Sequence, residues 1–202
     1  MANLITISRF PLLFIYIAIL YIGGDAALLW NVPFIILIFL LDTLDGWVAR
    51  RRGEQSLLGS VLDIATDRTL EYVLWVVYAH LGLIPILVPI IVLIRGTIVD
   101  AVRSMGMKEE LSPFDQIQSP LNRFLVSSRF MRAIYGFAKG AAAALLTLAF
   151  ALVVSGSDWS NLVTQVALGF TWFSVFLCVI RGVPVLVEGY RSLQSKSTTA
   201  RP

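Results

Sequence analysis

Long apolar runs constrain this chain more than any other feature of its sequence. Several of them approach or exceed the roughly 20 residues that an α-helix needs to span a bilayer. Hydrophobic residues make up 57% of the 202 residues, charged residues only 14%, and the mean hydropathy is +0.81. The chain is therefore expected to be an integral membrane protein. Its spans are expected to be helices, because helices satisfy their backbone groups internally and the alternating pattern of a barrel is absent.

The sequence predicts an all-α membrane domain over residues 1–191 with six transmembrane helices. Glycine, proline and small polar residues interrupt helices, so turns are expected at Gly23-Gly24, at Asn31 with Pro33, at Gly82 with Pro85 and at Ser155-Gly156-Ser157. Residues 192–202 are short of apolar side chains and are expected to form a disordered tail. The predicted spans are approximately 9–23, 31–50, 57–81, 83–104, 133–155 and 162–188.

The placement of lysine and arginine predicts the topology. These residues occur between the second and third spans, between the fourth and fifth spans, and in the C-terminal tail. The other three connections contain neither residue. Because cytoplasmic connections carry an excess of positive charge, both termini are expected to be cytoplasmic.

Four aspartates stand in two apolar segments at fixed spacing. Asp42 and Asp45 are three residues apart, and Asp63 and Asp67 are four apart, so each pair shares one helix face. The connection over residues 50–58 brings the two faces together. At a rise of 1.5 Å per residue, the carboxylates would lie roughly 6–12 Å from the cytoplasmic turn. Charged residues at such depth are costly and usually mark function, so a polar cavity open to the cytoplasm is expected.

Divalent metal is the natural partner of this group of acids. Ligand sets made only of oxygen suit Mg²⁺ or Mn²⁺, and four carboxylates can hold two ions. Two such ions can stabilise both the attacking and the leaving oxygen of a displacement at phosphorus. The small residues Gly46, Ala49 and Gly59 would let a phosphorylated ligand approach the backbone. A structural ion pair is the alternative explanation. We prefer it for Glu71, which follows Arg68 by three residues, and for Asp100, which could pair with Arg95.

Written out, the motif reads D-x-x-D-G-x-x-A-R, then eight residues, then G-x-x-x-D-x-x-x-D. At every defined position it matches the pattern of the CDP-alcohol phosphotransferases, and the chain therefore resembles this family. The opening residues from Asn3 to Arg9 also look like the segment that often precedes the first helix in the family. Its members transfer a substituted phosphate from a CDP-linked donor to an alcohol and release CMP.

The resemblance implies a role for each motif residue. Asp42, Asp45, Asp63 and Asp67 would form the site of two Mg²⁺ or Mn²⁺ ions, with Asp63 shared between them. Asp67 would also act as the general base that takes the proton of the acceptor hydroxyl. The CDP site would be lined by Gly46, Ala49, Arg50 and Gly59. In bacteria the donor is commonly CDP-diacylglycerol, and this donor is expected here. The resemblance also implies a homodimer. The protein is expected in a bacterial or archaeal plasma membrane, in contact with membrane lipids and without a nucleic-acid partner.

The acceptor is predicted from basic residues. Arg95 and Arg103 are eight residues apart and lie on similar helix faces. Phosphatidylglycerophosphate synthases have the pattern R-E-x6-R in this region, and here Gly96 replaces the glutamate. With Arg132 and Lys139, these cations would hold an acceptor phosphate. The predicted acceptor is sn-glycerol 3-phosphate, with an inositol phosphate, serine or phosphatidylglycerol as alternatives. Contact with lipid headgroups is the other explanation of the arginines.

A divalent metal transporter is the alternative of a different class, because intramembrane acids and arginines also line ion pathways. The acids gather at one membrane face, however, and no matching acidic site lies toward the other. Inverted repeats, which are typical of many transporters, are absent. The transferase is therefore favoured, and release of CMP would separate the two classes.

Overall fold

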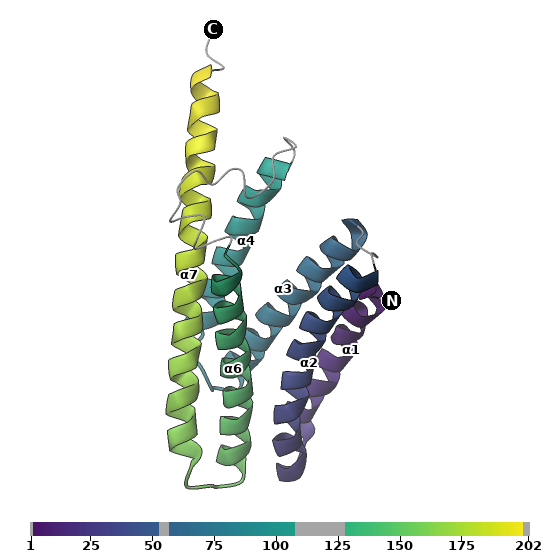
Figure 1. The fold of residues 1–202 in the computed structure, drawn as a ribbon. Helices are drawn as coiled ribbons and strands as arrows, with labels where there is room; N and C mark the ends of the chain where they lie inside the picture. The colour runs from purple at the N-terminus through teal and green to yellow at the C-terminus, as the bar shows by residue number, and fades with distance from the viewer. Residues whose placement is uncertain (1, 53–56, 108–127, 200–202) are drawn as a thin grey trace. The chain divides into compact units, whose positions relative to one another are not determined.

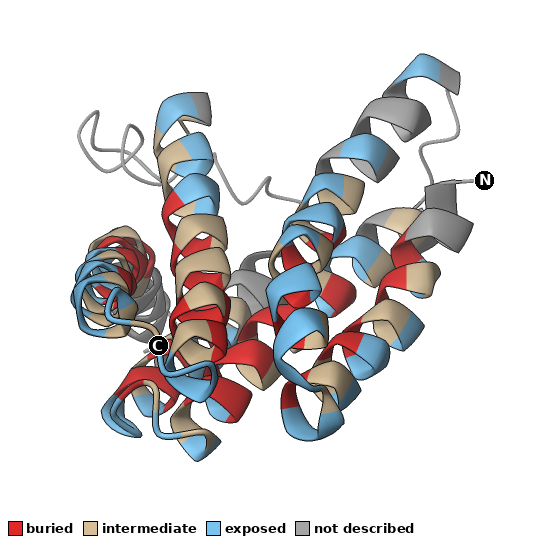
Figure 2. Ribbon diagram, turned by 90° about the horizontal axis from the view of Figure 1, so that it is seen from below, coloured by how far each residue is buried: buried red, intermediate tan, exposed pale blue. Residues whose placement is uncertain are grey.

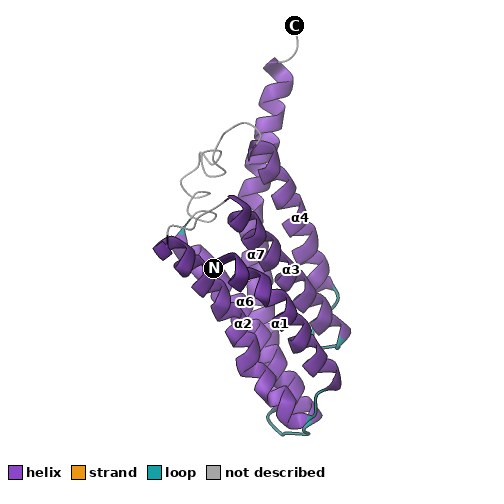
Figure 3. Ribbon diagram, turned by 90° about the vertical axis from the view of Figure 1, so that its right-hand side faces the viewer, coloured by secondary structure: helices purple, strands orange, loops and turns teal. Residues whose placement is uncertain are grey.

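The computed structural model describes residues 2–52, 57–107 and 128–199, although some side chains near helix ends lie outside the description. Over these ranges the chain is helical, and no strand is present (Figures 1 and 3). The all-α prediction is thus confirmed. The helices of the described residues are α1 (Ala2–Ile22), α2 (Asp25–Arg52), α3 (Leu57–His80), α4 (Leu87–Met107), α6 (Arg129–Val154) and α7 (Ser160–Thr199).

Three of these helices contain segments that are long and apolar enough to cross a membrane. The segments are Asp25–Asp42, Phe130–Val154 and Ser160–Val187, and Thr6–Ile22 is a shorter apolar stretch. Buried and exposed residues alternate at helical spacing, so that each helix has a covered side and an open side (Figure 2). The plan of six spans with cytoplasmic termini stays a prediction.

Large apolar side chains occupy the open sides of the helices. Phe14, Ile22, Trp30 and Phe137 are each at least 70% exposed. Extended apolar surface of this kind is unfavourable in water and marks contact with a partner or a membrane. The exposed apolar side chains of the described residues agree with a membrane location of the apolar helices.

The prediction of a turn at Asn31 and Pro33 is wrong, because α2 begins at Asp25 and continues through both residues. Asp25 lies in the first turn, where a negative charge stabilises the helix dipole. Asn31 is buried, and its side-chain nitrogen donates to the carbonyl oxygen of Tyr16 at 3.1 Å. Proline is tolerated inside membrane helices, where neighbouring helices and polar side chains satisfy the freed groups.

Glycines end α3 and α6 in the same way, as the sequence predicts. Gly82 and Gly156 have φ angles of 73° and 67°, a conformation that favours glycine at helix ends. The next residue along the chain donates back to the helix: Leu83 to Tyr78 at 3.0 Å and Ser157 to Leu152 at 3.0 Å. These two turns therefore cap the carbonyl ends of their helices.

Like α2, helices α1 and α7 extend well beyond the predicted limits. α1 begins at Ala2 instead of residue 9, so the opening segment up to Arg9 is helical. α7 continues to Thr199 and includes residues 192–199, where the sequence predicts a disordered tail. A helix that has already started adds residues at little cost, which explains the extension.

The chain divides into two units. The first unit comprises Met1–Pro89 with Lys139–Thr171, and the second comprises Ile90–Ala138 with Trp172–Pro202. In the first unit α1 contacts both α2 and α3. In the second unit Val99 of α4 and Val185 of α7 form a buried contact, and Val102 and Leu186 pack against it.

Three hydroxyl groups join α1, α3 and α6 within the first unit, and we call Tyr16, Tyr78 and Thr147 the tyrosine cluster. The Tyr16 hydroxyl lies 2.8 Å from that of Tyr78 and 2.5 Å from that of Thr147. Tyr78 and Thr147 each donate to the carbonyl oxygen of Ala143, at 3.1 and 2.7 Å. Tyr16 can then donate to either hydroxyl, so every donor of this buried cluster has an acceptor.

Candidate functional site

The described motif acids all belong to the first unit. Asp42 lies on α2, and Asp63 and Asp67 lie on α3. The side chains of Asp42 and Asp67 are 38% and 39% exposed, and Asp63 is exposed. The acids therefore keep part of their surface available to a ligand, as a binding role requires.

Several predicted site residues cannot be placed. The side chains of Asp45, Gly46, Ala49 and Arg50 lie outside the described residues. Gly59 of α3 is half-buried, which agrees with a position beside a cavity but does not identify one. The predicted CDP site thus stays a prediction.

Arg9 of α1 forms an ion pair with Asp42 of α2. The Arg9 side chain is completely buried, and its Nη1 donates to Oδ1 of Asp42 at 2.5 Å. Its Nε and Nη2 are buried without a hydrogen-bond partner among the described residues. Sequence reasoning noted Arg9 only as part of the opening pattern and missed this pairing. The available signal was an arginine inside an apolar helix, where such a charge needs an acid.

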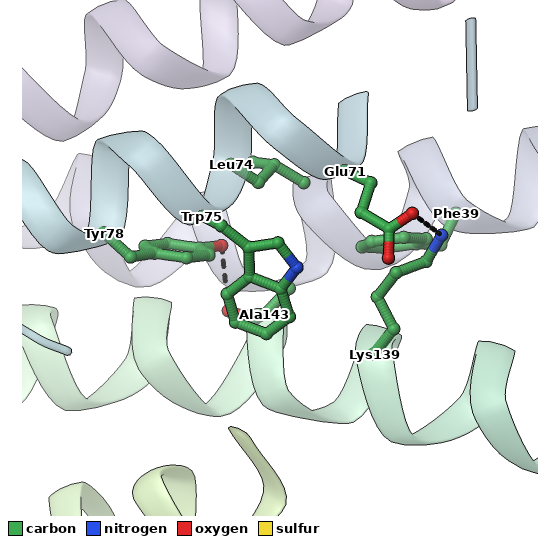
Figure 4. Close-up of a pocket in the computed structure, with 7 residues that line it drawn as sticks. All are labelled: Phe39, Glu71, Leu74, Trp75, Tyr78, Lys139 and Ala143. Carbon is green, nitrogen blue, oxygen red and sulfur yellow. Dashed lines mark hydrogen bonds and ion pairs between the residues drawn. The ribbon is translucent and has the colours of Figure 1, made fainter. Parts of the chain in front are cut away.

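Lys139 of α6 forms an ion pair with Asp67 of α3. Its Nζ donates to Oδ1 of Asp67 at 3.1 Å and lies 4.0 Å from Oε2 of Glu71. The lysine is buried, and Nζ also lies 5.9 Å from the ring centroid of Phe39. Figure 4 shows Lys139 reaching from α6 toward Glu71 and Phe39. We call Arg9–Asp42 and Lys139–Asp67 the charged pairs.

Glu71 has cations on two sides. Arg68 lies 3.2 Å from it on the same helix, so the structural ion pair that the sequence predicts is confirmed. Lys139 supplies the second cation from α6. A cavity of about 10 Å³ adjoins these groups and is also lined by Trp75 and Tyr78 (Figure 4). Such a volume has room for about one water molecule and is too small for a substrate.

The donor chemistry of the motif acids fits a hard divalent cation. The side chains available are carboxylates, which Mg²⁺ and Mn²⁺ prefer, and each keeps an exposed portion. Among the residues whose side chains are described, no group of three or more His, Cys, Asp or Glu is close enough to hold an ion. Asp45 is not among those residues, so the two-ion site stays a prediction.

The predicted acceptor residues fall in both units. Lys139 belongs to the first unit, whereas Arg95 and Arg132 belong to the second. Arg95 is half-buried on α4, and Arg132 is exposed on α6. The side chain of Arg103 lies outside the described residues. Of these cations, Lys139 is the one whose contact with a motif acid is known.

Comparison with known proteins identifies the family. No curated protein matches the chain. A family profile described as CDP-alcohol phosphatidyltransferase matches residues 1–180, which include all four motif aspartates and most of the described helices. The match covers far more than half of the chain and agrees with its apolar helices. The chain therefore belongs to the CDP-alcohol phosphatidyltransferase family, whose members are membrane enzymes that transfer a phosphatidyl group from a CDP-alcohol to an alcohol acceptor.

Proposed function

We propose that this enzyme transfers a phosphatidyl group from CDP-diacylglycerol to sn-glycerol 3-phosphate, with release of CMP and formation of phosphatidylglycerol phosphate. The observation that carries the proposal is the state of Asp67. This carboxylate is held by a buried lysine at 3.1 Å, yet 39% of its side chain stays exposed. A base that must meet a substrate hydroxyl needs both a fixed orientation and an open face.

We infer a site for two divalent ions at Asp42, Asp45, Asp63 and Asp67. Bound Mg²⁺ or Mn²⁺ would neutralise the diphosphate of the donor and stabilise the leaving CMP. The support from this chain is the oxygen-only donor set and the partial exposure of Asp42, Asp63 and Asp67. Arg9 holds one oxygen of Asp42 from the buried side, which restricts the orientation of that carboxylate.

Asp67 accepts the proton of the acceptor hydroxyl in this proposal. A positioned base contributes roughly 10²–10⁴-fold to such a reaction. Lys139 keeps the carboxylate in place through Oδ1. When Asp67 is neutralised by the proton, Glu71 at 4.0 Å continues to compensate the charge of the buried lysine. The pair can therefore pass through the protonated state without an isolated buried cation.

The substrate contacts follow the sequence prediction. Gly46, Ala49, Arg50 and Gly59 would bind the CDP moiety. The acceptor phosphate would be bound by basic side chains, since guanidinium groups form paired hydrogen bonds with phosphate oxygens. These side chains are Arg95, Arg103, Arg132 and Lys139.

The membrane arrangement is part of the same proposal. Six spans with both termini in the cytoplasm would place the aspartate motif toward the cytoplasm of a bacterial or archaeal cell. The basic connections support this orientation, because positive residues are retained on the cytoplasmic side. A homodimer is proposed from the family resemblance.

Lipid formation by purified protein tests the proposal. The assay contains CDP-diacylglycerol, Mg²⁺ and radiolabelled sn-glycerol 3-phosphate, and it measures labelled lipid together with CMP. We expect both products, and we expect neither when the divalent metal is removed with a chelator. No labelled lipid, from protein that still binds CDP-diacylglycerol, would exclude this acceptor. An inositol phosphate, serine and phosphatidylglycerol would then be tested in turn.

A further inference from the structure

Gly182 of α7 is a buried glycine against which the side chain of Arg95 packs. A Cβ atom at residue 182 would lie 2.7 Å from Nε of Arg95, 3.1 Å from its Cγ and 3.4 Å from its Cδ. The first of these distances is shorter than any nonbonded carbon–nitrogen contact allows. Any side chain at residue 182 would therefore displace Arg95 or separate the two helices.

Packing between α4 and α7 favours displacement of the arginine. Val99 follows Arg95 by one helical turn and forms the buried contact with Val185, which follows Gly182 by three residues. Arg95 and Val99 thus share one face of α4, and Gly182 and Val185 share one face of α7. Separation of the helices would break an apolar contact, whereas a long flexible side chain can move at lower cost.

Arg95 differs from the cations that lie beside the acids of α2 and α3. Within the described part of the chain its guanidinium has no hydrogen bond or ion pair, and its Nε is buried. Arg9, Arg68 and Lys139 each have a carboxylate partner. The Arg95 residue as a whole is half-buried, so part of its surface stays open to a ligand. A half-buried cation without an acid is costly unless an anion binds it.

We propose that Gly182 is a positioning residue that seats Arg95 for the phosphate group of the acceptor. The inference rests on the proposed function, because it assigns the acceptor phosphate to Arg95. Glycine at residue 182 leaves room for the stem of the arginine beside the backbone of α7. The planar guanidinium is then held in one orientation, which suits paired hydrogen bonds to phosphate oxygens.

Gly182→Ala tests the inference, with Gly169→Ala as the matched control. Gly169 also lies on α7, but a Cβ there meets nothing within 4 Å. Alanine is the better helix former, so neither change should unfold α7. We expect Gly182→Ala to raise the KM for sn-glycerol 3-phosphate by about tenfold or more, the loss typical of a charge-assisted contact. The KM for CDP-diacylglycerol and both constants of Gly169→Ala should stay within about twofold of wild type.

A double-mutant cycle separates positioning from general packing. Arg95→Ala should raise the same KM, and it removes the atoms with which the new methyl group collides. Adding Gly182→Ala to Arg95→Ala should then cause no further increase, because the glycine acts through the arginine. A further increase in the double variant would overturn the inference, as would a Gly182→Ala variant that behaves like Gly169→Ala.

Thermal stabilisation by sn-glycerol 3-phosphate gives a binding measurement that needs no turnover. We expect wild type and Gly169→Ala to be stabilised and Gly182→Ala to need about tenfold more ligand for the same shift. If stabilisation depends on Gly182 but no labelled lipid forms, the proposed reaction is refuted and the positioning role of Gly182 is supported. If labelled lipid forms and Gly182→Ala has no effect, the proposed reaction is supported and the positioning role is refuted. Absence of both product and stabilisation would overturn both.

Discussion

The first unit contains two sets of polar residues that join helices, the tyrosine cluster and the charged pairs, and these sets differ in charge and in exposure. The tyrosine cluster is neutral and buried, and each of its donors has an acceptor. The charged pairs combine a buried cation with a carboxylate that stays about two-fifths exposed. The first group is complete without a ligand, whereas the second retains oxygen atoms that can still bind one.

This difference separates residues that hold the fold from residues that act. A buried hydrogen-bond network that is fully satisfied makes a unique arrangement of helices more rigid. A buried cation beside an open carboxylate fixes that carboxylate and leaves it accessible. We therefore expect changes in the tyrosine cluster to affect stability alone. Changes in the carboxylates of the charged pairs should affect turnover or metal binding, and they should also lower stability where the buried cation has no second acid nearby, as for Arg9 but not for Lys139.

Asp67→Asn should have the largest effect on the reaction. It removes the base and should lower the rate of CMP release by at least about 100-fold. Binding of CDP-diacylglycerol and thermal stability should change little, because Glu71 still compensates the charge of Lys139. Near wild-type turnover would remove Asp67 from the catalytic role.

Asp42→Ala should have the largest effect on stability. It leaves the completely buried Arg9 without its acid, and loss of one member of a buried pair costs about 3–5 kcal/mol. Arg9→Met should cost less, about 1–2 kcal/mol, because the partly exposed carboxylate can return to water. Chemical unfolding of both variants in one detergent measures the difference. A larger loss for Arg9→Met would contradict the assignment of the buried partner.

Asp63→Asn should alter the response to metal. Loss of a residue that only hydrogen-bonds to a metal ligand already weakens metal binding by about 10-fold. If Asp63 is a ligand shared by two ions, the Mg²⁺ concentration that gives half of the maximal rate should therefore rise by at least this factor. Asp158→Asn is the control, since Asp158 is exposed in the turn before α7. An unchanged Mg²⁺ requirement in Asp63→Asn would count against a shared ligand.

Thr147→Val should have the smallest effect and should act on stability alone. It removes one donor to Ala143 and one partner of Tyr16, at a cost of about 1 kcal/mol. Thr171→Val is the matched control, because Thr171 is also buried and donates to the carbonyl oxygen four residues earlier, that of Ala167, at 2.8 Å. The stability loss should be larger for Thr147→Val, since its hydroxyl also contacts another helix. Equal losses would show that the contact with Tyr16 contributes nothing measurable.

The sequence predicted the class of fold and the family because both depend on local patterns. Long apolar runs indicate helices, and the spacing of the aspartates identified the family motif. The expected turn at Asn31 and Pro33 failed, since neither residue reveals that Asn31 has a partner on α1. Local composition signals a break, and only tertiary packing decides whether the helix continues.

The basic residues that pair with the acids could not be predicted from the sequence, because these pairs also depend on tertiary packing. Lys139 and Asp67 are 72 residues apart, and Arg9 and Asp42 are 33 apart. Spacing places the acids on a common face but gives no information on which distant cation reaches them. Lys139 is a basic residue in an apolar helix, and the sequence predicts a contact with the acceptor phosphate but gives no indication of the contact with Asp67. By contrast, the pair of Arg68 and Glu71 was predictable, because three residues on one helix suffice to join them.

The central claim is tested most directly by measuring the turnover and the thermal midpoint of Asp67→Asn, Thr147→Val and wild type. The three proteins are purified separately in the same detergent. The account predicts that Asp67→Asn loses CMP release at an unchanged midpoint. It predicts that Thr147→Val has a lower midpoint and keeps wild-type turnover. If both variants instead lose turnover in proportion to stability, the two polar groups are one structural network, and the division between them is wrong.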